Sequence, residues 1–103
     1  MNKTMIIGNL TRDPESRTTD SSSVCSFVVA VNRRSQSQQA DYFRVSAWNG
    51  LGENCQKYLA KGKKVCVVGR ISASAYVGQD GEAHASLDLL AEEVEFLSPS
   101  QQQ

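Results

Sequence analysis

The chain has 103 residues, enough for one domain whose core needs neither disulfides nor a metal. Its composition, 40% hydrophobic and 21% charged, is ordinary for a soluble globular protein, and no stretch approaches the roughly 20 apolar residues of a membrane-spanning helix. The first residues do not resemble a secretory signal. We therefore expect a cytoplasmic protein.

The charges are divided unevenly along the chain. The formal net charge is zero, which by itself argues against a nucleic-acid partner. However, all 11 Lys and Arg residues lie in residues 1–79 with only five acidic residues, whereas residues 80–103 carry six acidic residues and no basic one. This asymmetry predicts either a cationic face that suits nucleic acid or ordinary solvated surface charge.

Three cysteines, Cys25, Cys55 and Cys66, are widely spaced within apolar segments. Their number is odd and no pair has C-x-x-C spacing, so we expect free, buried thiols that act as small hydrophobic residues. The single histidine, His84, leaves too few ligands for zinc and is expected to be a solvated hairpin residue. We predict no metal and no cofactor.

The first part of the chain predicts two strands separated by a polar loop. Residues 4–10 are apolar and β-branched and end in turn residues, which predicts a first strand. Residues 16–23 are polar and predict a loop. The valine-rich residues 24–32 predict a second strand, and residues 33–39 a flexible polar tip.

The third predicted strand, residues 41–48, is the most informative. Period-two alternation assigns its core face to three apolar residues: Phe43, Val45 and Ala47. The opposite face carries a mixed set: Tyr42, Arg44, Ser46 and Trp48. Two aromatic rings on either side of an arginine are an unusual combination of side chains for a face that only contacts solvent.

The second half of the chain predicts a helix and two strands. The helix starts near Asn49-Gly50 and stops before Gly62, with apolar residues at helical spacing: Leu51, Cys55, Tyr58 and Leu59. Residues 63–71 are apolar on both faces, which predicts a central fourth strand. Residues 78–81 predict a hairpin tip. The fifth strand, residues 85–96, changes phase near Glu92 and Glu93, which indicates a β-bulge.

Five strands with one short helix between the third and fourth give the element order of an all-β OB-fold, a partly open barrel that often binds oligonucleotides or oligosaccharides. We assign residues 1–97 to this domain and residues 98–103 to a polar tail or the start of a disordered linker. Four aromatic residues fall on apolar faces and are expected in the core: Phe27, Phe43, Tyr58 and Phe96. No catalytic triad, P-loop or paired-carboxylate motif is recognisable, so we expect no enzymatic activity.

The opening segment MNKTMIIGNLTRDPE resembles the bacterial single-stranded DNA-binding protein (SSB) family, where a first strand runs into Gly-Asn-Leu and then Asp-Pro-Glu. The resemblance covers roughly residues 1–97 and continues, in order, through FVVAVNRR, WNGLGEN, YLAKGK and VGR. It implies an OB-fold core domain that coats single-stranded DNA in replication, recombination and repair, at the nucleoid, usually as a homotetramer whose first strands help to pair the subunits. It implies no catalysis.

The resemblance also implies site residues. Bases are expected to stack on three aromatic side chains, whose alternative role is packing in a core or a subunit interface: Tyr42, Trp48 and Tyr76. We predict phosphate contacts from six basic residues: Lys3, Arg33, Arg34, Arg44, Lys61 and Lys63. Arg44 is favoured because it lies between two of the aromatics. The alternative for each is simple solubilisation, and for Lys61 and Lys63 also an interaction with the helix dipole.

The chain departs from the family pattern at three places. A stacking aromatic found in some members falls in Arg33-Arg34-Ser35, which contains none. No basic residue lies between Arg70 and Tyr76, so we expect a lower affinity. The acidic C-terminal tip that recruits replication and repair proteins is not present before Gln103, so we expect such partners only if a full-length protein carries that tip.

Two alternative functions remain open at this stage. A primosomal replication protein N-like OB protein would be similarly short and lack the acidic tip, although its third-strand and helix sequence should match less closely. An OB module could instead bind an oligosaccharide or a protein, with the aromatics stacked on sugar rings or filling an interface. The sequence does not decide between a dimer and a tetramer, or between DNA and RNA.

Overall fold

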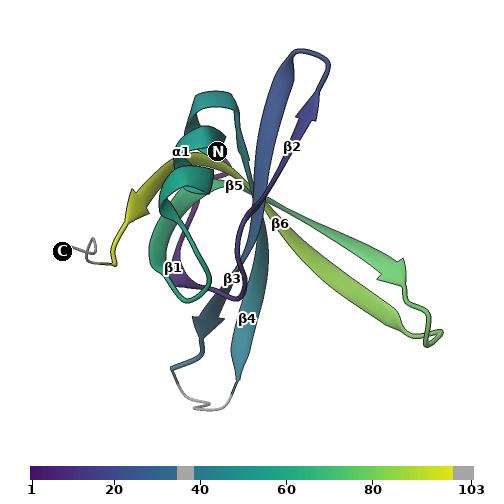
Figure 1. Cartoon of the computed structure of the whole chain (residues 1–103). Coiled ribbons are helices and arrows are strands. Elements are labelled where there is room, and N and C mark those ends of the chain that lie inside the picture. The colour runs from purple at the N-terminus through teal and green to yellow at the C-terminus, as the bar shows by residue number, and fades with distance from the viewer. Residues whose placement is uncertain (35–38, 99–103) are drawn as a thin grey trace.

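The structure is a computed structural model of the chain, and it describes residues 1–34 and 39–98. Most of the predicted polar tip and most of the predicted tail therefore lie outside the described residues. The described part contains six strands and one helix, in the order β1 (Thr4–Leu10), β2 (Glu15–Thr19), β3 (Ser22–Asn32), β4 (Ala40–Trp48), α1 (Asn49–Tyr58), β5 (Lys64–Val77) and β6 (Ala83–Phe96) (Figure 1).

Five of the strands close into a ring. Antiparallel pairs join β1 to β5, β5 to β6 and β3 to β4, while β4 runs parallel to β6. The ring closes where Asn9 and Leu10 of β1 meet Ala30 and Val29 of β3. The closure is short, and the β4–β6 pairing is short as well, so the barrel is partly open. The predicted all-β OB-fold, with its helix between the third and fourth barrel strands, is confirmed.

The prediction of a loop over residues 16–23 is wrong. Strand β2 pairs antiparallel with the start of β3, from Glu15 opposite Ser26 to Thr19 opposite Ser22, and lies outside the ring. Every residue of β2 is exposed, so backbone hydrogen bonds to β3 hold it in place and no side chain enters the core. A strand with no buried face leaves no apolar alternation in the sequence.

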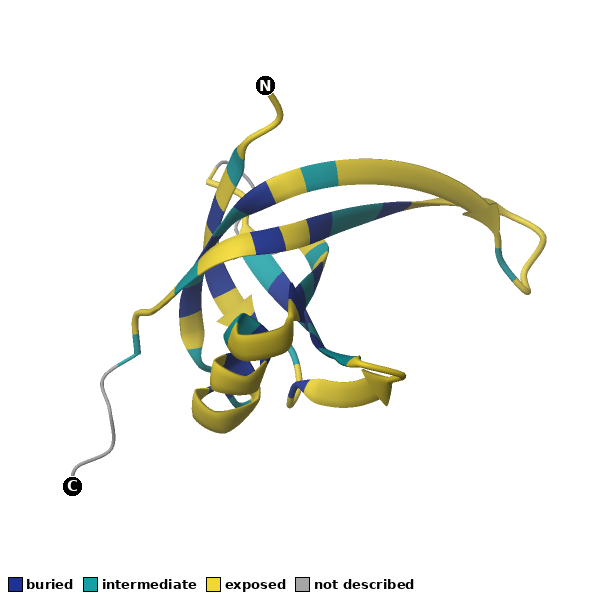
Figure 2. Cartoon of the chain, turned by 90° about the horizontal axis from the view of Figure 1, so that it is seen from above, coloured by how far each residue is buried: buried dark blue, intermediate teal, exposed yellow. Residues whose placement is uncertain are grey.

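The core lies inside the ring and follows the alternation along the strands, which Figure 2 shows as buried and exposed bands. Val29, Val65 and Val67 are fully buried, and Phe27 is 4% exposed, as predicted. Phe43 packs against this cluster from its edge. Helix α1 covers one end of the barrel through its buried face, and the turn after it uses Gly62 at a φ of 87°, a conformation that favours glycine.

Three residues expected in the core lie nearer the surface. Tyr58 is the last residue of α1 and Phe96 the last of β6, where the barrel ends, and they are 55% and 41% exposed. Their rings pack on each other instead, with centroids 5.7 Å apart. Cys66 is half-buried on the outer side of β5, whereas Cys25 and Cys55 are buried; all three thiols are free.

The predicted bulge in the last strand is confirmed. Val68 of β5 pairs with Glu93, but the next residue, Gly69, pairs with Ala91, so Glu92 is the extra residue. A Cβ atom at Gly69 would collide with the carbonyl oxygen of Leu90, which explains the glycine at this crossing of the strands.

Beyond the bulge, β5 and β6 continue as a long hairpin that stands away from the barrel (Figure 1). We refer to residues 72–87 as the arm. The predicted fourth strand stopped at residue 71, but β5 runs on to Val77, because pairing with β6 holds residues 72–77 although all of them are exposed. The predicted hairpin tip over residues 78–81 is confirmed, with the Gly78 amide donating to the Glu82 carbonyl.

Candidate nucleic-acid interface

Strand β4 presents its aromatic residues to solvent. Tyr42 is 59% exposed and Trp48 is 41% exposed, whereas Val45 and Ala47 between them are buried. The side chain of Arg44 is 68% exposed and lies on the same side as the two rings. The alternation therefore places the three predicted residues of this strand on its outer face, as expected.

The pairing register extends this face across β3 and β2, because directly opposed residues of paired strands share a face. Trp48 lies opposite Val24 of β3, which in turn lies opposite Arg17 of β2. Two residues along, on the same face, Ser46 of β4 lies opposite Ser26 of β3. The side chain of Arg17 thus belongs to the same surface as the indole of Trp48.

The face also extends in the other direction, through β6 to β5. Arg44 lies opposite Asp88 of β6, and Leu90 of β6 lies opposite Arg70 of β5. Counting in steps of two from Arg70 leads along β5 to Tyr76 in the arm. Tyr42, Trp48 and Tyr76 therefore project from one continuous face of the sheet, which we call the outer face.

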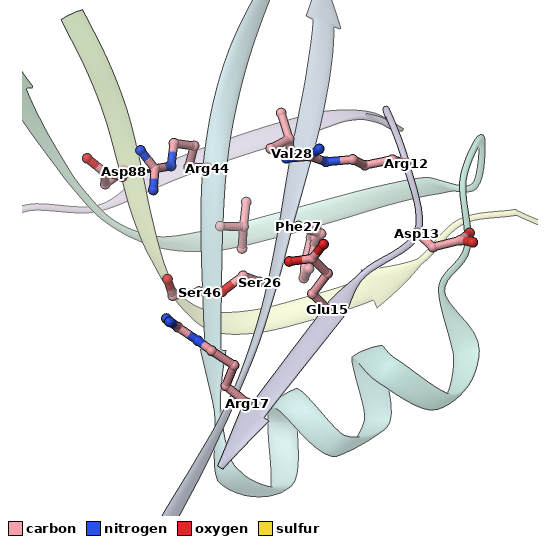
Figure 3. Close-up of a pocket in the computed structure, with 11 residues that line it drawn as sticks. Arg12, Asp13, Glu15, Arg17, Ser26, Phe27, Val28, Arg44, Ser46 and Asp88 are labelled. Carbon is pink, nitrogen blue, oxygen red and sulfur yellow. Dashed lines mark ion pairs between the residues drawn. The ribbon is translucent and has the colours of Figure 1, made fainter. Parts of the chain in front are cut away.

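A groove of about 300 Å³ is hollowed in the middle of the outer face, over β2, β3 and β4 (Figure 3). Three arginines line it: Arg12, Arg17 and Arg44. The hydroxyl residues Ser26 and Ser46 form part of its lining. Three carboxylates line it as well: Asp13, Glu15 and Asp88. Guanidinium groups and hydroxyls are donors that suit phosphate oxygens, so the groove offers contacts for an anionic backbone within a lining of mixed charge.

Arg12 and Arg17 are not among the residues predicted from the sequence. Arg12 lies in the turn after β1, and Arg17 lies in the strand that was expected to be a loop. Recognising residues 15–19 as a strand paired with β3 would have placed Arg17 on the same face as Trp48, with Val24 between them. No apolar pattern marked that strand, so nothing in the sequence distinguished these arginines from other exposed ones.

Carboxylates accompany the basic residues of the outer face. Arg44 Nε lies 3.7 Å from Asp88 Oδ1, and Lys3 Nζ lies 3.9 Å from Glu92 Oε1. Both carboxylates come from β6, which lies between β5 and β4 in the sheet. The acidic end of the chain is therefore inserted among the basic residues, and the uneven charge along the sequence does not produce a purely cationic face.

Arg33 is not brought to the outer face. Its Nη2 and Nε atoms lie 2.8 and 3.1 Å from Asp41 Oδ1, and alternation places Asp41 on the opposite side of β4 from Tyr42. The hydrogen bond from Arg33 to Asp41 and the charge of that carboxylate raise the pKa of the guanidinium above its ordinary value. Arg34 is exposed just beyond the end of β3.

Lys61 and Lys63 lie at one end of the groove, in the loop between α1 and β5. The backbone amide of Lys61 donates to Asp13 Oδ1 at 2.8 Å, and the carbonyl of Lys63 accepts from the Leu10 amide at 2.9 Å. Asp13 itself lines the groove. The loop thus borders the turn that carries Arg12, away from the aromatic rings of β4.

Tyr76 lies near the far end of the arm and is 53% exposed. The ring of His84 stacks on it with centroids 5.4 Å apart, and His84 Nε2 lies 3.2 Å from Asp80 Oδ1. The Glu82 amide and His84 together lower the pKa of Asp80. His84 is exposed in the hairpin as expected, and it supports one side of the Tyr76 ring.

Within residues 1–34 and 39–98, no three His, Cys, Asp or Glu side chains gather into a set that could hold a metal ion. The same part of the chain contains no helix long and apolar enough to cross a membrane.

Residues 1–97 match the single-strand binding protein family. The chain belongs to this family. It is 38% identical to single-stranded DNA-binding protein 2 of Clostridium acetobutylicum over 102 residues, covering 94% of this chain and 77% of that protein. It is 38% identical to single-stranded DNA-binding protein 1 of Staphylococcus aureus strain Mu50 and 39% identical to the single-stranded DNA-binding protein of Bacillus cereus, and covers 67% and 61% of their lengths. The family resemblance predicted from the sequence motifs is confirmed.

Proposed function

We propose that this SSB family member binds single-stranded DNA without sequence preference and protects it during replication, recombination and repair in the cytoplasm, at the nucleoid. The observation that carries the proposal is the arrangement on β4, where two exposed aromatic rings flank an exposed arginine on a face that also holds an arginine-lined groove. Aromatic platforms with a basic groove are the elements of sequence-tolerant single-strand binding, because every base has a flat face and every nucleotide a phosphate.

The spacing of the rings supports separate stacking of different bases. Tyr42 and Trp48 lie six positions apart on β4. At about 3.3 Å per residue this is about 20 Å, too far for one base to contact both rings. Each stack contributes about 1–3 kcal/mol, so two or three rings give substantial affinity without any reading of base edges. Tyr76 adds a third platform on the arm.

The phosphates are assigned to the arginines of the groove, Arg12, Arg17 and Arg44, with Lys61 and Lys63 at its end and Lys3 beside β6. Arg33 and Arg34 contact the single-stranded DNA only where the DNA passes the end of the β3–β4 hairpin. All of these residues act in binding, and the protein works without a catalytic step.

We further propose that the protein acts as a homo-oligomer, a tetramer or a dimer, joined through β1. Residues 4–8 of β1 pair with β5 on one side only, and the contact with β3 begins at Asn9, which leaves a free backbone edge. Met5 and Ile7 project outward beside it and are 66% and 47% exposed. Replication and repair proteins are expected as partners only where an acidic C-terminal tip is present.

A titration tests the proposed function. Oligo-dT, a duplex of the same length and an oligosaccharide are added separately to the protein while Trp48, its single tryptophan, is followed by fluorescence. We expect strong quenching by oligo-dT alone, with an affinity that falls with salt at a slope of about −0.7 per neutralised phosphate. Quenching by the oligosaccharide, or equal binding of duplex and single strand, would favour a different OB-fold function.

A further inference from the structure

Asp88 occupies the middle of the outer face. It lies on β6, directly opposite Arg44 of β4, and it lines the same groove as the three arginines (Figure 3). Its side chain is 42% exposed, so both solvent and a bound DNA strand can reach it. A carboxylate at this point carries the same charge as the phosphates that the groove is proposed to bind.

The carboxylate is held in position by its own strand. The hydroxyl of Ser86 donates to Asp88 Oδ2 at 3.2 Å, and Ser86 is itself buried, with 8% of its surface exposed. The other oxygen, Oδ1, is the one that lies 3.7 Å from Arg44 Nε. One oxygen is therefore anchored and the other is turned towards the arginine, which distinguishes Asp88 from a freely rotating surface carboxylate.

This geometry sets Asp88 and a DNA phosphate in competition for one guanidinium. A phosphate that approaches Arg44 shares its guanidinium with the carboxylate and lies beside that negative charge, since the hydrogen bond from Ser86 keeps Asp88 in the groove. Both effects reduce the gain from the phosphate contact. We propose that Asp88 is an internal competitor that lowers the affinity of the outer face for single-stranded DNA and speeds release; the inference rests on the proposed function.

Arg44 differs from the other groove arginines, which lack such a partner among the described residues. Arg12 and Arg17 form no ion pair within the 4.0 Å limit that Arg44 meets. Asp13 and Glu15 also line the groove, but within the described residues only Asp88 pairs with one of its arginines. Removing the charge of Asp88 therefore frees one paired cation for the DNA.

The test compares Asp88→Asn with Glu95→Gln by measuring oligo-dT binding from low to high salt. Asparagine keeps an oxygen that can accept from Ser86, so the local hydrogen bond is retained. Glu95 is exposed on the barrel end of β6, opposite Cys66, and makes no ion pair within the described residues, so it controls for the loss of one negative charge.

We expect Asp88→Asn to bind about two- to fivefold more tightly than wild type at low salt, the range of an exposed ion pair. The salt slope should steepen by about 0.7, and the gain should come largely from slower dissociation. Glu95→Gln should bind like wild type. Equal affinities for Asp88→Asn and Glu95→Gln would overturn the inference while leaving the proposed function intact.

A double variant shows whether the effect acts through Arg44. In an Arg44→Gln background, adding Asp88→Asn should no longer produce the additional salt dependence, because no guanidinium is left to release. A full gain in that background would overturn the competition mechanism. If the wild-type protein itself fails to bind oligo-dT, the proposed function falls, and this inference falls with it.

Discussion

Replacement of Tyr42 by alanine separates binding from folding more cleanly than any other change on the outer face. The ring is 59% exposed and lies opposite Ala30, whose side chain is a single methyl group. Its removal leaves no cavity in the core, so the free energy of unfolding should change by no more than about 0.5 kcal/mol. The consequence of Tyr42→Ala should therefore be seen almost entirely in DNA binding.

The expected size follows from the loss of one stacked base. A base–aromatic stack contributes about 1–3 kcal/mol, which corresponds to an affinity reduced by a factor of about 5 to about 150. Tyr58→Ala is the matched control, because Tyr58 is the same residue type with a similar exposure of 55%, but it packs on Phe96 at the end of the barrel. That variant should bind with nearly wild-type affinity.

The assay is fluorescence anisotropy of a labelled oligo-dT, with urea unfolding of both variants as the stability check. The ratio of the two affinities isolates the contribution of the Tyr42 stack, since both variants lose one exposed phenol. If Tyr58→Ala weakened binding as much as Tyr42→Ala, or if Tyr42→Ala bound as well as wild type, the assignment of the outer face of β4 would be refuted.

Three further predictions follow from the same structure. Arg17→Gln should reduce the salt slope of oligo-dT binding by about 0.7, and an unchanged slope would remove Arg17 from the groove's phosphate contacts. Leu89→Ala, at a core position that is 1% exposed, should lower the free energy of unfolding by about 2–5 kcal/mol in urea titration, and a loss below 1 kcal/mol would argue against its place in the core. Burial raises the pKa of the Cys25 thiol, and that of Cys55 to about 12, so at pH 8 a thiol reagent should label Cys66 well before these two, and equal labelling rates would contradict the burial.

The barrel strands could be predicted because each buries one face. Apolar alternation located β1, β3 and β4 within a residue or two, and the change of phase in β6 located the bulge at Glu92. Strand β2 and the outer half of β5 bury no side chain, so backbone pairing alone holds them and the sequence carries no periodic signal for either. Tyr58 and Phe96 were misplaced because periodicity shows the direction of a side chain but not where the barrel ends.

The candidate site was only partly predictable for a related reason. Tyr42, Arg44 and Trp48 lie on one strand, so alternation alone placed them together. Arg17 and Asp88 join them through pairings with β3 and β6 that connect distant parts of the chain. Pairing of this kind is set by the closed sheet and is not visible in local sequence.

Single-stranded DNA is proposed to lie on the outer face, against the rings of β4. Photo-crosslinking with oligo-dT that carries 5-iodouracil, followed by mass spectrometry of the digested complex, tests it most directly. We expect crosslinks to Tyr42 and Trp48, with Tyr76 joining them on longer oligonucleotides. Crosslinks concentrated on Tyr58 and Phe96, with none on β4, would contradict it.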